Sequence, residues 1–348
     1  MSVRTLIVDD SASMQAMIRR TLSLDPAIEI VGTASCANEA RAAIKALDPD
    51  VVTLDVEMPG MNGLEFLERL MRLRPTPVVM LSTLTSEGAE ISLTALEFGA
   101  FDCFDKASLR SAAASDGASE LAGLVRAAAR SRPRANASAS CHPTPAAPPR
   151  ASADYRPRAG SMIAIGASTG GVEALIALLT EFPAQCPPTV IVQHMPATFT
   201  PSFAARLDRL CQPRVVEARP GAPMQVGTVY LAPGGGRHME IAGSGERRHC
   251  RLIEEDKVNG HRPSVDRLFR SVARIAGRDA VGAILTGMGN DGAQGLYEMR
   301  AAGSVTIGQD EATSVVYGMP AVAQQIGAVA EQLPLRRIAA RLLAECQA

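Results

Sequence analysis

The sequence predicts an α/β protein built from two doubly wound parallel-sheet domains with a flexible linker between them. Short apolar runs alternate with segments of helical periodicity before residue 107 and again after residue 160. Ala, Ser, Pro and Arg dominate the stretch between these halves, where apolar periodicity disappears. The chain has 348 residues, 47% of them hydrophobic, which is enough for two cores.

The first half contains five expected strands that alternate with helices. The strands are expected over residues 5–10, 28–34, 50–60, 76–83 and 101–106, and the helices over 13–22, 37–47, 63–73, 89–100 and 119–130. Short apolar strands in regular alternation with helices favour a parallel sheet with helices on both faces.

The same alternation resumes after the linker. Strands are expected over residues 161–168, 188–195, 228–235, 280–289 and 304–309, helices over 171–182, 199–211, 264–277, 292–303 and 335–346, and a hairpin from 239–243 and 250–255. In such sheets, ligands bind at the carboxyl ends of the strands. The polar residues that follow the strands are therefore the first candidates for functional sites.

Charge is divided unevenly along the chain. The net charge is −1 overall, but −7 over residues 1–107, +5 over 108–160 and +1 over the remainder. The acidic first part suits a cation site, and the basic middle suits a solvated linker. We expect one domain over residues 1–120, a linker over 121–159 and a second domain over 160–348.

Composition also narrows the setting of the protein. The seven cysteines are scattered and form no C-x-x-C pair, which favours reduced thiols in the cytoplasm. The start of the chain meets acidic residues too early for a signal peptide, and no apolar run is long enough to cross a bilayer. The near-neutral charge and the absence of a basic recognition helix argue against a nucleic-acid-binding output.

Acidic side chains follow two of the expected strands in the first half. Asp9 and Asp10 end the first strand and Asp55 ends the third, so their carboxylates could hold one hard divalent cation such as Mg²⁺. Ser82 ends the fourth strand and Lys106 follows the fifth. A hydroxyl and an ammonium there could hold the oxygens of a phosphoryl group on Asp55.

A glycine-rich turn follows the first strand of the second half. It contains G-x-S-x-G, in which a sharp turn can present the Ser168 hydroxyl above the sheet edge. Two alternatives remain open at this point: a phosphate-binding loop, although the P-loop lysine is missing, and a plain strand-to-helix turn.

A serine nucleophile needs a base and a group that orients the base. His194 follows the next expected strand, and Asp291 follows a later one. Because parallel strands end side by side, both can lie near Ser168. Asp266, at a helix start where capping is the default role, and Asp310 are weaker candidates for the third group. The backbone N–H groups of Met288 and Gly289 could bind an oxyanion.

The segments VDDSASMQ, LDVEMPGMNGLEFL, VVMLST and FDK together resemble a response-regulator receiver domain, over about residues 1–107. The resemblance implies a flavodoxin-like fold with Asp55 as the phosphoacceptor. It also implies that Asp10, Asp55 and the backbone carbonyl of Glu57 bind Mg²⁺, with Asp9 alongside. Two positions depart from the family pattern: Ala107 replaces the usual proline, and Cys103 replaces an aromatic switch residue.

The segments IGASTGG, QHMP, YLAPGG, HRPSVDRLF and LTGMGNDG are similar to the chemotaxis protein-glutamate methylesterase domain, from about Ser161 to the end. The resemblance implies a Rossmann-like domain with Ser168, His194 and Asp291 as the triad, and with Thr169 and Met288 lining the site. It implies hydrolysis of glutamate methyl esters on methyl-accepting chemotaxis receptors, deamidation of receptor glutamines, and no metal at the esterase site.

The combination implies a cytoplasmic monomer that a chemotaxis histidine kinase phosphorylates and that neither binds nucleic acid nor enters the membrane. We expect the unphosphorylated receiver to hinder access to Ser168 and phosphorylation to relieve this. The main alternative is a receiver with a non-catalytic output, in which the glycine turn holds a nucleotide or a partner. A DNA-binding output is a second alternative.

Overall fold

The computed structural model describes residues 2–58, 62–83, 86–109, 114–131 and 155–348. The chain divides into two compact units, Met1–Thr144 and Pro145–Ala348. Most of the linker expected over residues 121–159 lies outside the described residues. No helix in the described parts of the chain is long and apolar enough to cross a membrane.

The first unit contains a five-stranded parallel sheet in the order β2-β1-β3-β4-β5, the strand order of flavodoxin-like folds. The strands are β1 (Val3–Val8), β2 (Ile28–Ala34), β3 (Val51–Asp55), β4 (Val78–Ser82) and β5 (Asp102–Asp105). The predicted fold of this half is confirmed, and the three central strands are buried along nearly their whole length.

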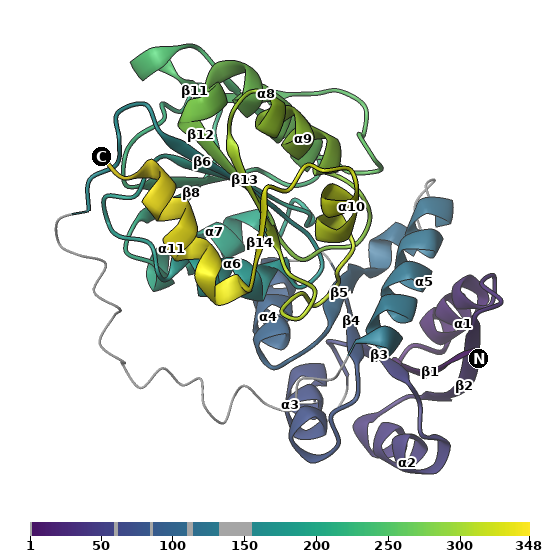
Figure 1. Ribbon diagram of the computed structural model, residues 1–348. Coiled ribbons are helices and arrows are strands. Elements are labelled where there is room, and N and C mark those ends of the chain that lie inside the picture. The colour runs from purple at the N-terminus through teal and green to yellow at the C-terminus, as the bar shows by residue number, and fades with distance from the viewer. Residues whose placement is uncertain (1, 59–61, 84–85, 110–113, 132–154) are drawn as a thin grey trace. The chain divides into compact units, whose positions relative to one another are not determined.

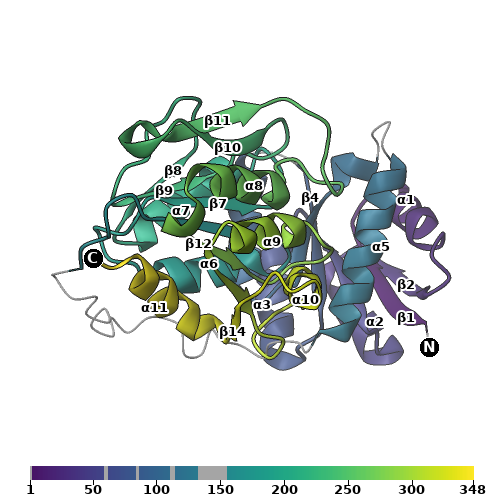
Figure 2. The same ribbon diagram turned by 45° about the horizontal axis from the view of Figure 1, so that its top comes forward.

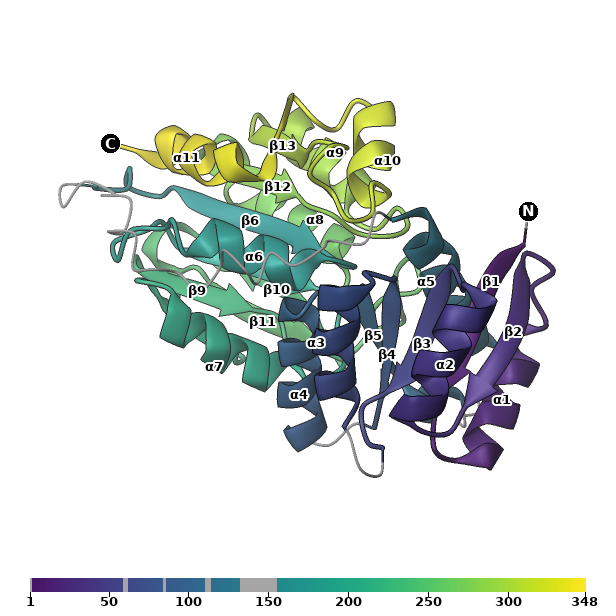
Figure 3. The ribbon, with the colours of Figure 1, turned by 90° about the horizontal axis from the view of Figure 1, so that it is seen from below.

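Helices cover both faces of this sheet. They are α1 (Ala12–Leu22), α2 (Ala37–Leu47), α3 (Gly63–Leu73), α4 (Ser86–Glu97) and α5 (Ala114–Arg130). Helices α1 and α5 lie side by side (Figures 1 and 2), and α2, α3 and α4 cover the other face (Figure 3). Helix α5 buries Leu121, Leu124, Val125 and Ala128. The expected boundary at residue 120 therefore cuts through a packed helix, whose apolar residues hold it to the first unit.

The second unit contains a seven-stranded parallel sheet in the order β14-β13-β12-β6-β7-β9-β8. The strands are β6 (Met162–Ala167), β7 (Thr189–Gln193), β8 (Arg214–Glu217), β9 (Thr228–Leu231), β12 (Ala280–Ile284), β13 (Val305–Gln309) and β14 (Glu331–Leu333). Strands β8 and β14 were not predicted. Both are short edge strands poor in apolar residues (RVVE and EQL), so they show no hydrophobic pattern.

The helices of the second unit are α6 (Gly171–Leu179), α7 (Thr200–Leu210), α8 (Val265–Ile275), α9 (Ala293–Ala301), α10 (Met319–Gln325) and α11 (Leu335–Cys346). Helices α6 and α11 lie on one face of the sheet, and α8 and α9 on the other (Figure 1). The expected hairpin is present as β10 (His238–Ala242) and β11 (His249–Ile253), and β10 packs against α8 (Figure 2).

Strand β6 is the first strand of the second unit and lies in the middle of its sheet. It pairs with β7 on one side and with β12 on the other. The carboxyl ends of these three strands therefore lie next to one another, at the point where the chain changes direction through the sheet. Ligand sites of open α/β sheets form at such a point.

The cysteines of the described residues are free thiols. Cys186, Cys250 and Cys346 are buried in the second unit, and burial raises the pKa of Cys186 and Cys250 to about 12 and that of Cys346 to about 11. They behave as small core side chains. Cys141 lies outside the described residues.

Candidate functional sites

An acidic site lies at the carboxyl ends of β1 and β3 in the first unit. Carboxylate oxygens of Asp9, Asp10 and Asp55 lie within 4.8 Å of one another. Lys106 Nζ lies 2.7 Å from Asp9 Oδ2 and 2.7 Å from Asp55 Oδ2, and its side chain is almost completely buried. The structure thus brings together the three acids and the lysine that the strand ends indicated.

These side chains line a cavity of about 340 Å³, to which Ser82 and Glu57 also contribute. The Ser82 hydroxyl is buried and has no hydrogen-bond partner among the described residues. The Glu57 backbone N–H donates to Asp55 Oδ1 at 3.2 Å. A buried hydroxyl without a partner next to a carboxylate and an ammonium is suited to an anionic group attached to Asp55.

The Asp55 carboxylate is in an unfavourable environment for its own charge. Burial is the largest cause and raises its pKa, the two interactions with Lys106 oppose this, and repulsion from Asp9 adds to it. The net effect is a raised pKa. Three clustered carboxylates offer the oxygen ligands that a hard divalent cation prefers, so the donor set agrees with Mg²⁺.

Cys103 occupies the position at which the receiver family pattern has an aromatic switch residue. It lies on β5, and its Sγ lies 3.5 Å from the backbone carbonyl oxygen of Ser92 on α4. Burial raises the pKa of the Cys103 thiol far above its usual range. A neutral thiol held against α4 has no ring that could rotate between two positions.

Ser168 and His194 follow neighbouring strands of the second unit. Ser168 comes directly after β6 and His194 directly after β7, and the His194 N–H donates to the Ala167 carbonyl at 3.1 Å. The Gln193 side-chain amide donates to the carbonyls of both Ser168 (2.9 Å) and His194 (3.1 Å). A buried glutamine therefore ties the two candidate residues to each other through their backbones.

Asp291 reaches His194 from the loop after β12. His194 Nε2 lies 2.9 Å from Asp291 Oδ2, and its N–H donates a hydrogen bond to this carboxylate. His194 Nδ1 is buried and has no hydrogen-bond partner among the described residues. In the neutral ring this nitrogen carries the free lone pair, so it is the atom that can accept a proton.

The Asp291 carboxylate lies at the N-terminus of α8, and its acceptor positions are filled. Oδ1 accepts from Ser264 Oγ (2.7 Å) and Asn259 Nδ2 (3.1 Å), and Oδ2 accepts from the Val265 N–H (2.7 Å). Burial opposes the charge of Asp291. The hydrogen bonds from His194, Ser264 and Asn259 outweigh it and hold the pKa of this carboxyl well below its usual range.

A glycine allows the Asp291 loop to approach Ser168. A Cβ on Gly287 would lie 2.7 Å from Ser168 Cβ, and the Ser168 N–H donates to the Thr286 carbonyl at 3.0 Å. In the described parts of the chain, the backbone N–H groups of Thr169, Met288 and Gly289 have no acceptor. N–H groups without an acceptor are available to bind an anionic oxygen.

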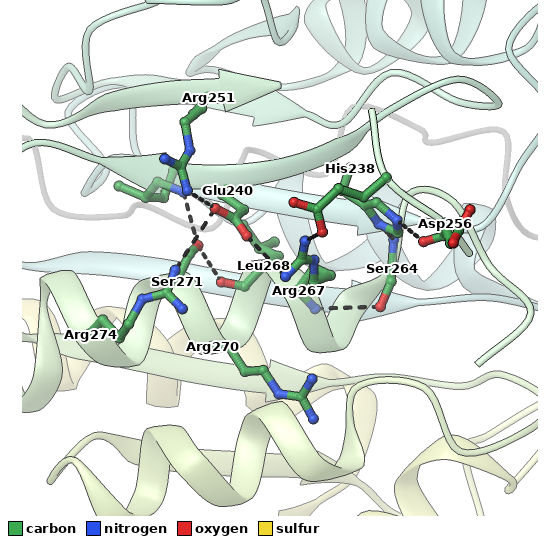
Figure 4. Close-up of polar contacts among 12 residues, drawn as sticks. His238, Glu240, Arg251, Asp256, Ser264, Arg267, Leu268, Arg270, Ser271 and Arg274 are labelled. Carbon is green, nitrogen blue, oxygen red and sulfur yellow. Dashed lines mark hydrogen bonds and ion pairs between the residues drawn. The ribbon is translucent and has the colours of Figure 1, made fainter. Parts of the chain in front are cut away.

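Two further histidines, His238 and His261, belong to this region. His238 is buried at the start of β10; its Nε2 donates to the Asp256 carbonyl (2.9 Å), and its Nδ1 accepts from the Ser264 N–H (3.1 Å) (Figure 4). His261 stacks on His194. Strand-end position, the signal that located His194, could not locate His261, because His261 lies on a turn between β11 and α8 and follows no strand of the main sheet.

The two weaker acid candidates have other roles. Asp266 accepts from the Gly295 N–H (2.6 Å) and links α8 to α9, whereas the cap of α8 is Ser264. Asp310 accepts from the backbone and hydroxyl of Thr313 in a turn. Among the described residues, neither contacts His194.

The two units define a class of protein: a response regulator whose output domain is an enzyme of the hydrolase type. A family model described as "Response regulator receiver domain" matches residues 5–113, and one described as "CheB methylesterase" matches residues 163–342. The chain therefore belongs to the CheB methylesterase family.

Close relatives cover nearly the whole chain. A protein-glutamate methylesterase/protein-glutamine glutaminase from Agrobacterium fabrum is 58% identical, over 98% of this chain and 95% of its own length. A relative with this name, numbered 1, from Caulobacter vibrioides is 55% identical over 98% of this chain and 97% of its own. The crystal structure of the Thermotoga maritima CheB methylesterase catalytic domain covers 54% of this chain and 99% of its own, with 36% identity and a TM-score of 0.52.

Proposed function

We propose that this protein hydrolyses the γ-methyl esters of glutamates on methyl-accepting chemotaxis receptors and deamidates particular receptor glutamines. One observation carries the proposal. His194 Nε2 and Asp291 Oδ2 lie 2.9 Å apart, and His194 follows β7, the strand that neighbours β6, at whose end Ser168 lies. The names of the relatives, protein-glutamate methylesterase/protein-glutamine glutaminase, supply the substrate class. In this proposal the protein binds receptors, does not bind nucleic acid and does not insert into the membrane.

The proposed reaction begins with attack of Ser168 Oγ on the ester carbonyl carbon. His194 Nδ1 accepts the serine proton, and Asp291 stabilises the imidazolium through Nε2. The N–H groups of Thr169, Met288 and Gly289 hold the oxyanion. When the carbon–oxygen bond to the methoxy group breaks, His194 returns the proton and methanol leaves.

Water completes the reaction. It gives a proton to His194 Nδ1 as its oxygen attacks the acyl carbon, and Ser168 leaves with that proton. The products are a glutamate carboxylate and the free enzyme. A glutamine side chain would follow the same route with ammonia as the leaving group.

In the first unit, Asp55 is the proposed phosphoacceptor, with a chemotaxis histidine kinase as the donor. Asp9, Asp10, Asp55 and the Glu57 carbonyl would hold Mg²⁺, whose contribution when bound is to neutralise charge on the phosphoryl group. Ser82 and Lys106 would hold phosphoryl oxygens. Residues 1–130 would act as the receiver and 160–348 as the esterase, with phosphorylation relieving hindrance of Ser168.

The test is methanol release from methylated receptor membranes by the full chain, with and without a phosphodonor. We expect a Ser168→Ala or His194→Ala variant to lose activity by at least about 10³-fold, as removal of a triad member does elsewhere. The exposed Ser244 and the remote His249 provide matched controls: Ser244→Ala and His249→Ala should retain turnover. Normal turnover by the Ser168 variant would refute the proposal.

A further inference from the structure

A tight turn lies against both members of the histidine–aspartate pair. In Val258–Asn259–Gly260–His261, the His261 N–H donates to the Val258 carbonyl (2.9 Å) and the Val258 N–H to the His261 carbonyl (3.1 Å). Asn259 has φ +52° and Gly260 has φ +81°. Positive φ at both central positions is the type I′ arrangement that Asn-Gly favours, so the sequence itself specifies this turn.

The first contact of the turn is with Asp291. Asn259 Nδ2 donates to Asp291 Oδ1 (3.1 Å) and to Asp266 Oδ2 (2.8 Å) on α8. The side chain of the turn is thereby fixed to the helix that supplies most of the other donors to Asp291.

The second contact is with His194. The rings of His261 and His194 are parallel to within 7°, with their centroids 3.7 Å apart. Among the described residues, the His194 ring has one hydrogen bond, at Nε2. One bond allows the ring to tilt about the line to Asp291 and so to move Nδ1. A flat ring stacked on its face removes this freedom.

From these contacts we propose that His261 is a positioning residue, which holds the plane of the His194 ring and thereby the position of Nδ1, the atom that has to reach the serine hydroxyl. The inference rests on the proposed function and deepens it. His261 itself exchanges no proton in this role, so another flat ring of similar size can replace it.

The charge state of His261 agrees with this role. Burial is the largest cause, followed by the nearby His194, and together with Lys257 these lower the pKa of His261 to about 3, against the opposing effect of Asp291. His261 is therefore neutral at neutral pH. A neutral ring adds no repulsion when the stacked His194 takes up the serine proton.

The experiment compares three variants of the full chain by methanol release. His261→Phe keeps a flat ring, His261→Leu fills the space without one, and His261→Ala does neither. We expect Leu and Ala to lower kcat by about 10- to 100-fold with KM within about twofold, as small displacements of a reacting group do. We expect Phe to restore kcat to within about threefold of wild type.

Three results would overturn the inference: a wild-type kcat for the Leu and Ala variants, a Phe variant as slow as Ala, or an effect confined to KM. Thermal unfolding of each variant checks folding, and the Leu variant keeps the test decisive if Ala does not fold. His249→Ala serves as the remote histidine control. Failure of the proposed function would look different, because wild type itself would then release no more methanol than Ser168→Ala.

Discussion

Two aspartates, Asp55 at the end of β3 and Asp291 in the loop after β12, show how the local environment gives one residue type opposite electrostatic properties. Both are buried. Asp291 accepts hydrogen bonds that stabilise its charge, so its pKa is lowered. Asp55 is desolvated and repelled by Asp9, and Lys106 compensates only partly, so its pKa is raised. The Asp291 carboxylate is a fixed anion, whereas the Asp55 carboxylate is suited to accept a cation and a phosphoryl group.

Replacing Asp55 by Asn should have two effects. Labelling by acetyl phosphate should disappear, because the acceptor oxygen is gone. At pH 7 without divalent cations, the first unit should melt at a higher temperature than wild type. A raised folded-state pKa means that the charged form is penalised above that pKa, and Asn removes the penalty.

The measurement is thermal unfolding in the presence of a chelator, repeated with Mg²⁺. Added Mg²⁺ should stabilise wild type more than the variant, because ion binding to the folded state is linked to stability. Persistent labelling, or a variant that melts below wild type in chelator, would contradict the assignment.

At the scale of the element, hydrophobic periodicity predicted most of the strands and helices, and strand-end position predicted where the polar side chains gather. The five receiver strands, the central strands of the second sheet and the β10–β11 hairpin were all predicted. The edge strands β8 and β14 and helix α10 were not, because β8 (RVVE) and β14 (EQL) contain too few apolar residues to stand out and α10 (MPAVAQQ) is only about two turns long.

The site followed the same rule. Ser168 and His194 directly follow strands, and Asp291 lies in the loop after a third strand. A parallel sheet therefore brings their backbones together. Ser264, Asn259 and His261 contact the pair from α8 and a turn, and their distances depend on how α8 packs on the sheet. Packing of this kind leaves no periodic signal in one sequence.

Helix α8 owes its position to a glycine in β6. A Cβ on Gly166 would lie 2.2 Å from Val265 Cγ1, in the first turn of α8. Gly166→Ala should therefore displace the helix, cost about 1–3 kcal/mol of stability as overpacking does, and lower kcat because Asp291 loses its donors.

The second substitution Val265→Ala removes the clashing methyl groups, so the double variant should recover most of the stability and activity. Gly236→Ala is the matched control, since a Cβ there meets nothing within 4 Å. Denaturant unfolding and methanol release measure both properties. A double variant no better than Gly166→Ala alone would show that this contact does not position α8.

At the scale of the whole molecule, the pH dependence of stability follows from two histidines, the buried His238 and the half-buried His261. The pKa of His261 is lowered to about 3 and that of His238 is also lowered, chiefly by burial. Between the folded value and about 6.5, the unfolded chain binds protons that the folded chain does not. Stability of the second unit should therefore be retained above pH 6.5 and fall as the pH decreases toward 3.

One such group contributes up to about 1.4 kcal/mol per pH unit, so His261→Phe should flatten the profile between pH 4 and 6. Opening of the second unit can be followed by alkylation of the buried Cys250 thiol at increasing urea. His249→Ala should leave the slope as in wild type. An unchanged slope in the Phe variant would contradict the assigned protonation state.

The place of β6 has a consequence for how the second unit can be made. During synthesis β6 leaves the ribosome first, but its neighbour β12 follows only after the hairpin and α8. Strand β6 cannot complete its pairing until β12, which is distant in the sequence, has been synthesised. Long-range pairing of this kind slows folding. A nascent chain that ends before β12 carries the serine and the histidine but no aspartate. Under the proposed mechanism, hydrolysis of a methyl ester therefore has to await synthesis of the loop after β12.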